Sequence, residues 1–181
     1  MRLSDVLQDI VVLRSEADLQ MEITGVSYDS RQTKPGDLFV AMAGFATDGH
    51  KYIPAAVEKG AVCVLCQTPP EGNIPYVQVE NSRRALAVVG ANFFRHPARE
   101  MTMVGVTGTN GKTTTTYLLK DILEHAAGAK VGLIGTNQNM IGDQVLHTER
   151  TTPESFEVQK LFREMADAGC THVVMEVSSH A

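Results

Sequence analysis

The segment from Thr102 to Thr116, TMVGVTGTNGKTTTT, constrains the fold more than any other part of the chain. It begins with an apolar run typical of a strand, passes through a turn with two glycines and one lysine, and ends in hydroxyl residues that open a helical pattern. Gly108 and Gly111 let the backbone curl so that several N–H groups converge on one anion, and the helix dipole favours negative charge there. The segment therefore predicts a strand, a phosphate-binding loop and a helix.

The loop departs from the strict Walker A pattern G-x-x-x-x-G-K-[ST]. Val106 stands where that pattern requires glycine, with Gly105 one residue early and Gly108 two residues late. Lys112 can still reach the β- and γ-phosphates, and the Thr113 hydroxyl can still bind Mg²⁺. A plain glycine-rich connection is the alternative, but it gives no reason for the lone lysine or the run of hydroxyls. We therefore interpret the loop as a nucleotide site.

Composition limits the classes of partner. The 181 residues are 43% hydrophobic, which is enough for one large domain or two ordinary ones. Only 6% are aromatic and there is no Trp, and 16 basic against 21 acidic residues give a net charge of −5. These values argue against nucleic acid or an anionic membrane surface as the partner. With no signal-peptide pattern and no run near the ~18 apolar residues of a membrane span, we expect a cytoplasmic protein.

The three cysteines are expected to be free thiols, because their number is odd and no export signal is apparent. Cys63 and Cys66 form a C-x-x-C, which raises the possibility of a metal or redox site. They lie, however, in the strand-like run AVCVLC, where residues three apart point to opposite faces. We interpret them as buried strand cysteines.

The pattern of apolar runs predicts an α/β fold in two domains. Strand-like and helical segments alternate over residues 1–98, and the sequence HPAR at 96–99 has the composition of a linker. Residues 99–181 contain the phosphate loop, a second apolar run at 130–135 and a third at 171–177, each separated by a helical pattern. Such βαβ units favour a mostly parallel sheet. MIGDQV at 140–145 is typical of a hairpin turn.

The third apolar run ends in MEVSSH, which places Glu176 at the end of a strand. Ligands of parallel sheets bind at the carboxyl ends of the strands, so Glu176 is expected on the same edge as the phosphate loop. A glutamate in an apolar strand is costly unless it is paired or coordinated, so it indicates either a Mg²⁺ ligand or a buried salt bridge. His180 fits a substrate contact or a surface histidine equally well.

Taken together, these motifs resemble the Mur ligases of peptidoglycan synthesis. The similar segments of the second domain are TGTNGKTTT at 107–115, Thr151–Thr152 before a helix, and MEVSSH at 175–180. In the first domain YDSR at 28–31, PGDLFVA at 35–41 and DGH at 48–50 resemble the family's uridine-nucleotide-binding domain. EVSSH is similar to the ligases that add the third peptide residue. The family's loop has the form TGTNGKT, which accounts for Val106.

The resemblance implies an ATP- and Mg²⁺-dependent amide ligase. Such an enzyme joins a diamino acid, meso-diaminopimelate or L-lysine, to the D-glutamate of UDP-MurNAc-L-Ala-D-Glu through an acyl phosphate. It implies a small UDP-substrate-binding domain over 1–98 and the first part of a P-loop ATPase domain over 99–181. Family members continue further, with more ligands, a carbamylated lysine and a third domain. We therefore expect an amino-terminal fragment that is inactive alone and that does not itself identify the added amino acid.

Carried over position by position, the resemblance assigns roles to individual residues. ATP would be held by Gly108, Thr109, Asn110, Gly111, Lys112, Thr113 and Thr114. Mg²⁺ would be held by Thr113 and Glu176, and catalysis would involve Lys112 and Glu176. The uridine end of the substrate would contact Tyr28, Ser30, Phe45, Ala46 and Thr47. Its muramyl-peptide end would contact Arg150, Thr151, Thr152 and Ser178.

Some positions leave alternatives open. Residues 45–47 are Phe-Ala-Thr where other members have polar side chains, so contact there would be through the backbone, and Pro153 stands where some members have glycine. Tyr28 and Ser30 could instead belong to a turn stabilised by Asp29 and Ser30. The activity could also be that of a dipeptide-adding or folylpolyglutamate-synthetase-like ligase, or the chain could be a non-catalytic UDP-sugar and ATP binding module.

A further expectation concerns assembly. If the strand that ends in SSHA has no covering helix, it leaves an open sheet edge, and an open edge favours dimerisation or swapping.

Overall fold

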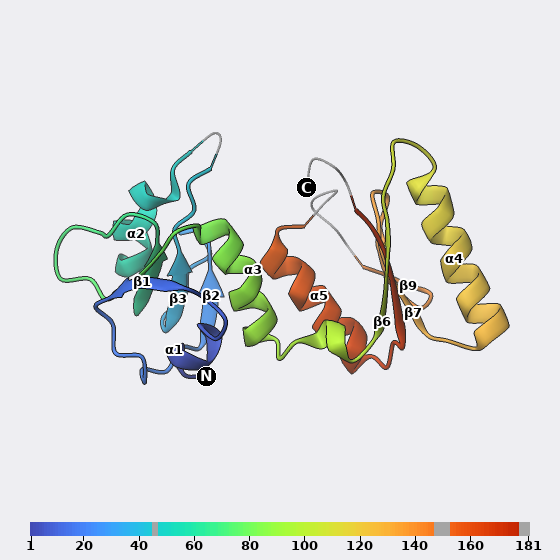
Figure 1. The fold of residues 1–181 in the computed structure, drawn as a ribbon, viewed down its shortest axis with the longest axis horizontal. Helices are drawn as coiled ribbons and strands as arrows, with labels where there is room; N and C mark the ends of the chain where they lie inside the picture. The colour runs from blue at the N-terminus through green and yellow to red at the C-terminus, as the bar shows by residue number, and fades with distance from the viewer. Residues whose placement is uncertain (45–46, 147–152, 178–181) are drawn as a thin grey trace. The chain divides into compact units, whose positions relative to one another are not determined.

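The structure is a computed structural model that describes residues 1–44, 47–146 and 153–177. The chain forms two compact units, Met1–Phe93 and Phe94–Ala181 (Figure 1). This division lies a few residues before the expected boundary between 98 and 99. Ala98 belongs to the second unit because it packs against that unit's hydrophobic core.

The first unit contains a five-stranded sheet with the order β1-β5-β4-β3-β2. Its strands are β1 (Val12–Ser15), β2 (Gly25–Ser27), β3 (Asp37–Val40), β4 (Cys63–Cys66) and β5 (Tyr76–Val79). Strands β2 to β5 are parallel, and β1 pairs antiparallel with β5. The carboxyl ends of β2, β3 and β4 therefore lie along one edge of the sheet.

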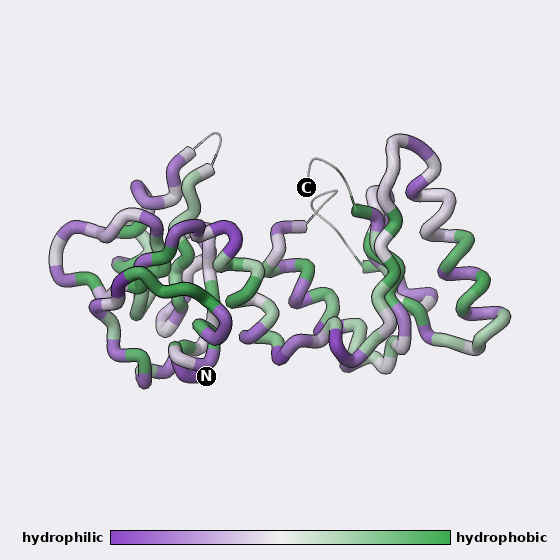
Figure 2. Tube along the Cα trace, in the orientation of Figure 1, coloured by the Kyte–Doolittle hydropathy of each residue, from purple (hydrophilic) through white to green (hydrophobic). Residues whose placement is uncertain are grey.

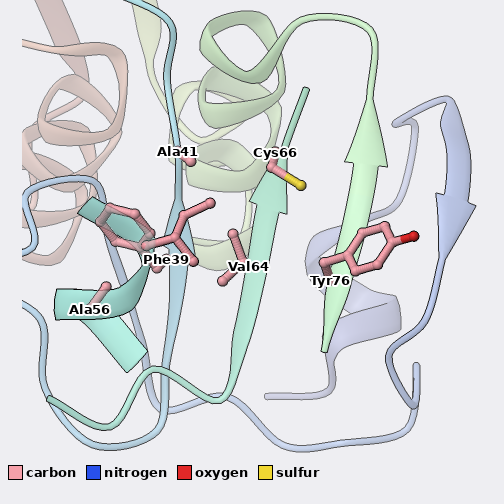
Figure 3. Close-up of a cluster of buried hydrophobic side chains, with 7 residues drawn as sticks. Phe39, Ala41, Ala56, Val64, Cys66 and Tyr76 are labelled. Atoms are coloured by element: carbon pink, nitrogen blue, oxygen red, sulfur yellow. The ribbon is translucent and has the colours of Figure 1, made fainter. Parts of the chain in front are cut away.

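The helices of this unit are α1 (Leu3–Val6), α2 (Ile53–Glu58), α3 (Ser82–Phe93) and the short 3₁₀ helix η1 (Gly49–Tyr52). Figure 3 shows Phe39, Val64 and Tyr76 projecting from three neighbouring strands, with Ala56 of α2 beside them. Because side chains alternate along a strand, Leu38 and Val40 of β3 and Leu65 of β4 form the opposite, equally buried face.

Both cysteines of the C-x-x-C lie in β4 and are buried, as the strand pattern predicts. Burial in apolar surroundings raises the pKa of the Cys63 thiol to about 12 and that of Cys66 to about 11. Thiols in this state are poor nucleophiles and poor metal ligands.

The second unit has a five-stranded sheet with the order β6-β10-β7-β8-β9. Its strands are β6 (Thr102–Val106), β7 (Val131–Ile134), β8 (Asn139–Ile141), β9 (Gln144–Leu146) and β10 (His172–Glu176). Strands β6, β10 and β7 are parallel, whereas β8 and β9 form an antiparallel hairpin that extends the sheet from β7. The α/β class and the hairpin are confirmed, and the sheet is mixed.

Two longer helices cover the two faces of the parallel strands, α4 (Lys112–Ala127) and α5 (Ser155–Asp167), and η2 (Pro97–Arg99) precedes β6 (Figure 1). Val131, Leu133 and Val174 pack towards α4, whereas Ile134 and Val173 pack towards α5. In Figure 2 hydrophobic and hydrophilic stretches alternate along α4, as expected of a helix with one face on a sheet. None of the described helices is long and apolar enough to cross a membrane.

The expectation of an open sheet edge at the strand ending in SSHA is wrong. Strand β10 pairs with β6 on one side and with β7 on the other. The crossover from β6 through α4 to β7 leaves a gap of one strand, and β10 fills it. Among the described residues, the unpaired edge on that side of the sheet belongs to β6.

Candidate functional site

The phosphate-loop segment folds as a strand, a loop and a helix, in the order that its sequence predicts. The loop connects β6 to α4. Gly108 has φ +145° and Gly111 has φ +77°, values that side chains disfavour, so both positions require glycine. Gly111 is the N-cap of α4, and its carbonyl accepts the first hydrogen bond of the helix, from Thr115 N at 2.9 Å. The loop therefore ends at the positive pole of a sixteen-residue helix.

Lys112 is the first residue of α4 and lies over the loop. Its Nζ donates a hydrogen bond to the Gly108 carbonyl at 2.7 Å. The ammonium group therefore lies at the loop that is predicted to hold phosphate. Exchanging this carbonyl for a phosphate oxygen would replace a neutral acceptor by a charged one, which forms the stronger hydrogen bond.

Glu176 and Thr113 meet beside this loop. Glu176 ends β10 and stands in register with Val106, the last residue of β6. It shares the α4 face of the sheet with Val174, two residues earlier, and it is only 7% exposed. Thr113 Oγ1 donates a hydrogen bond to Glu176 Oε2 at 3.2 Å.

A residue that the sequence analysis missed completes this cluster. Thr136 follows β7 and donates twice to Glu176, from its backbone N to Oε1 at 3.1 Å and from its Oγ1 to Oε2 at 3.0 Å. Its signal is its position directly after the apolar run at 130–135, where it shares an edge with the phosphate loop. No described lysine or arginine pairs with Glu176, so these residues do not form the buried salt bridge considered as an alternative.

The oxygen atoms of this cluster fit Mg²⁺. Two neighbouring ligands of an octahedral Mg²⁺ lie about 2.9 Å apart, given metal–oxygen distances of about 2.05 Å, close to the 3.2 Å between Thr113 Oγ1 and Glu176 Oε2. Mg²⁺ is commonly held by one or two carboxylates together with substrate phosphates. The described residues contain no group of three or more His, Cys, Asp or Glu that could hold a metal. Thr113 and Glu176 would supply two of the ligands of such an ion.

In the first unit, Tyr28 and Ser30 lie in a tight turn after β2. Asp29 Oδ1 accepts a hydrogen bond from Arg31 N at 3.0 Å, and its carboxylate also accepts from the Arg31 guanidinium. This side-chain hydrogen bonding lowers the pKa of Asp29. Asp29 therefore stabilises the turn, and Tyr28 and Ser30 are carried on it at the carboxyl edge of the sheet.

His50 joins two loops of the same edge. Its Nε2 accepts hydrogen bonds from the backbone N atoms of Gln67 at 3.0 Å and Thr68 at 3.2 Å, just after β4. Backbone N–H groups can only donate, so Nε2 carries no proton, and Nδ1 donates to Asp48 Oδ1 at 2.6 Å. The loop that follows β3, which includes Thr47, is thereby tied to the end of β4.

Several predicted contacts lie outside the described residues. They are Phe45, Ala46, Arg150, Thr151, Thr152, Ser178 and His180. Their assignments stay predictions.

Comparison with known proteins identifies the family. Residues 22–112 match the family model described as Mur ligase family, catalytic domain, and residues 106–181 match the Mur ligase middle domain. The chain belongs to the Mur ligase family. The resemblance expected from its motifs is thus confirmed.

The similar relatives carry specific names. The chain is 45% identical to the UDP-N-acetylmuramoyl-L-alanyl-D-glutamate–2,6-diaminopimelate ligase of Clostridium tetani, covering 100% of the chain and 38% of that protein. It is 46% identical to the ligase of the same name from Bacteroides thetaiotaomicron, again covering 100% and 38%. A UDP-N-acetylmuramyl-tripeptide synthetase of Roseiflexus sp. is 48% identical, with 100% and 36% covered. The chain thus spans well under half the length of these relatives.

Solved structures agree on the fold. A UDP-N-acetylmuramoyl-L-alanyl-D-glutamate–2,6-diaminopimelate ligase superposes with a TM-score of 0.80 at 23% identity, covering 99% of this chain and 36% of that one. MurF ligase of Thermotoga maritima in complex with ADP superposes with a TM-score of 0.60 at 25% identity, covering 86% and 32%.

Proposed function

We propose that the chain supplies the UDP-substrate unit and the phosphate-binding part of an ATP-dependent ligase. This ligase adds meso-diaminopimelate to the D-glutamate of UDP-MurNAc-L-Ala-D-Glu in the cytoplasm. One observation carries the proposal: the hydroxyl of Thr113 and the carboxylate of Glu176 meet 3.2 Å apart beside a glycine loop, in a chain that aligns over its whole length with diaminopimelate ligases.

In this proposal the phosphate loop binds the triphosphate of ATP. The backbone N–H groups of residues 108–114 and the dipole of α4 face the phosphate oxygens, and Lys112 leaves the Gly108 carbonyl to contact the β- and γ-phosphates. These groups orient the γ-phosphoryl group and neutralise its charge. Phosphoryl transfer depends mainly on positioning the phosphoryl group and neutralising its charge, and in this proposal the loop provides both.

Thr113 and Glu176 would hold Mg²⁺ between them. When bound, the ion would supply positive charge that offsets the charge of the phosphate oxygens. The amine of the incoming diamino acid then displaces phosphate from the acyl phosphate, giving the amide.

The first unit would bind the uridine end of the substrate. Tyr28 and Ser30, together with the backbone of 45–47, follow parallel strands at their carboxyl ends, which is where α/β sheets bind ligands. The turn around Asp29 holds Tyr28 and Ser30, and His50 ties its own loop to the residues just after β4. Arg150, Thr151, Thr152 and Ser178 are proposed for the muramyl-peptide end.

The alternatives have less support. Dipeptide-adding ligases share the fold, but the sequence relatives that are 45% and 46% identical over the whole chain are named for diaminopimelate addition. A folylpolyglutamate-synthetase-like activity gives no account of the first unit. A non-catalytic binding module would keep the nucleotide as a structural ligand, so its role would survive loss of Lys112.

Calorimetric titration of the 181-residue chain tests the proposal at the level of binding. UDP-MurNAc-L-Ala-D-Glu and Mg-ATP should each bind with one site per chain. Removal of Mg²⁺ with EDTA should weaken the binding of ATP but not that of UDP-MurNAc-L-Ala-D-Glu. Free UDP-GlcNAc and GTP serve as controls. Binding of neither ligand by folded protein would contradict the proposal.

A further inference from the structure

A single residue holds both oxygens of the Glu176 carboxylate. The backbone N of Thr136 donates to Oε1 at 3.1 Å and its hydroxyl donates to Oε2 at 3.0 Å. Two hydrogen bonds from one residue to the two oxygens fix the plane of the carboxylate as well as its position. A single hydrogen bond would leave the group free to turn about its last torsion.

The preceding glycine makes room for this arrangement. A Cβ atom built on Gly135 would lie 2.8 Å from Glu176 Oε1, closer than real contacts of this kind. From the other side, Gly135 N donates to Asn139 Oδ1 at 3.3 Å, and Asn139 is only 3% exposed. The turn formed by Gly135 and Thr136 is therefore anchored to buried structure on one side and to the carboxylate on the other.

The hydrogen bonds also decide which lone pairs remain for a cation. Each carboxylate oxygen has two acceptor positions. On Oε2, one faces the Thr136 hydroxyl and the other faces Thr113 Oγ1 at 3.2 Å. Because the Thr136 hydroxyl occupies one lone pair of Oε2, the other lone pair is directed at the site between Thr113 and Glu176. A cation there would replace the hydrogen bond between these two residues.

We infer that Thr136 is a positioning residue for the magnesium site: the turn of Gly135 and Thr136 aims the Glu176 carboxylate at the Mg²⁺ of Mg-ATP. This inference rests on the proposed function, because it requires Glu176 to be a metal ligand. Thr136 itself contacts neither the nucleotide nor the metal in this account. It acts through the carboxylate.

The first arm of the test measures ATP binding to the 181-residue chain by calorimetry, with Mg²⁺ and with EDTA. Thr136→Val removes the hydroxyl but keeps the backbone N–H and the size of the side chain. It should weaken Mg-ATP binding by about tenfold, which is the smaller of the losses expected when a residue that hydrogen-bonds a metal ligand is removed. Metal-free ATP binding should stay unchanged. Thr136→Ser should restore binding. Thr102→Val, at the other end of the same sheet, is the matched control.

The second arm uses no nucleotide. Urea midpoints of Thr136→Val, Glu176→Gln and the double variant form a double-mutant cycle, which should be non-additive because the two side chains share one hydrogen bond. Gly135→Ala should lower Mg-ATP affinity as Thr136→Val does. Gly105→Ala is its control, since a Cβ there would meet only Val177 Cγ2 at an ordinary 3.5 Å.

The outcomes separate the two claims. An additive cycle, an unchanged Mg-ATP affinity for Thr136→Val, or an equal loss with Mg²⁺ and with EDTA would each overturn the positioning role and leave the proposed function standing. If the wild-type chain binds ATP equally well with Mg²⁺ and with EDTA, Glu176 holds no metal, and both claims are contradicted.

Discussion

Among the described residues, Lys112 is the one basic side chain on the phosphate loop, and its Nζ donates a hydrogen bond to the Gly108 carbonyl. Lys112→Ala should weaken Mg-ATP binding by about tenfold or more, because hydrogen bonds to charged groups contribute about 1.5–3 kcal/mol. The thermal midpoint should hardly change, since this hydrogen bond is at the surface. Calorimetry and a melting curve measure the two effects.

The control for Lys112 is Lys160→Ala, which removes an exposed lysine of α5 from the same unit. It should leave ATP affinity unchanged. Equal affinities for wild type and Lys112→Ala would contradict the assignment of Lys112 to the phosphates.

His50 allows a matched pair of substitutions in the first unit. His50→Gln places an amide oxygen near the position of Nε2 and can still accept from the backbone of Gln67 and Thr68. His50→Asn keeps a donor near Nδ1 for Asp48 but loses that acceptor. Asn should therefore lower the free energy of unfolding by about 1 kcal/mol more than Gln, because backbone donors lose their partner. Urea denaturation measures the difference, and the reverse order would contradict the account.

Residues and motifs differ in how far the sequence alone reaches them. The loop TGTNGKT was predictable because glycine, lysine and hydroxyl residues at that spacing have few other uses. Glu176 was predictable because a carboxylate in an apolar strand needs a partner. Thr136 was not predictable, because a threonine after a strand is common. Its contact with Glu176 exists only because β10 lies between β6 and β7. That strand order is a tertiary property which local patterns do not contain.

At the scale of elements, β4 should respond to alkaline pH. Burial raises the pKa of Cys63 to about 12 and of Cys66 to about 11, whereas an exposed thiol has a value of 9.0. Unfolding therefore releases protons above pH 9, so the stability that these thiols contribute is complete below that pH and is lost as pH rises towards their folded values.

Urea midpoints measured between pH 8 and pH 10.5 test this expectation. The wild-type midpoint should fall more steeply with pH than that of the double variant Cys63→Ala/Cys66→Ala, which has no thiols in β4. Parallel pH profiles would show that the two thiols remain protonated in both states or ionise in both.

At the scale of the whole molecule, the sheet edge at β6 is the place to look for self-association. Thr102 N bonds Thr171 O and Val106 O accepts from Val177 N, both towards β10, so the alternation of a parallel pair turns the N–H groups of Met103 and Gly105 outwards. Unpaired edges favour pairing with another chain. We expect a concentration-dependent dimer by light scattering after size-exclusion chromatography. Met103→Pro removes one outward N–H and should weaken that dimer, and a monomer at all concentrations would contradict the expectation.

At the scale of the whole molecule, a chimeric enzyme tests the proposed ligase function directly. Residues 1–181 joined to the remaining sequence of the Clostridium tetani relative would form a complete ligase, since the chain aligns over its whole length with 38% of that protein. The measurement is formation of UDP-MurNAc-tripeptide from UDP-MurNAc-L-Ala-D-Glu, ATP and labelled meso-diaminopimelate. We expect product from the chimera and none from its Lys112→Ala variant. A folded chimera that binds both substrates yet forms no product, while the parent enzyme does, would contradict the proposed function.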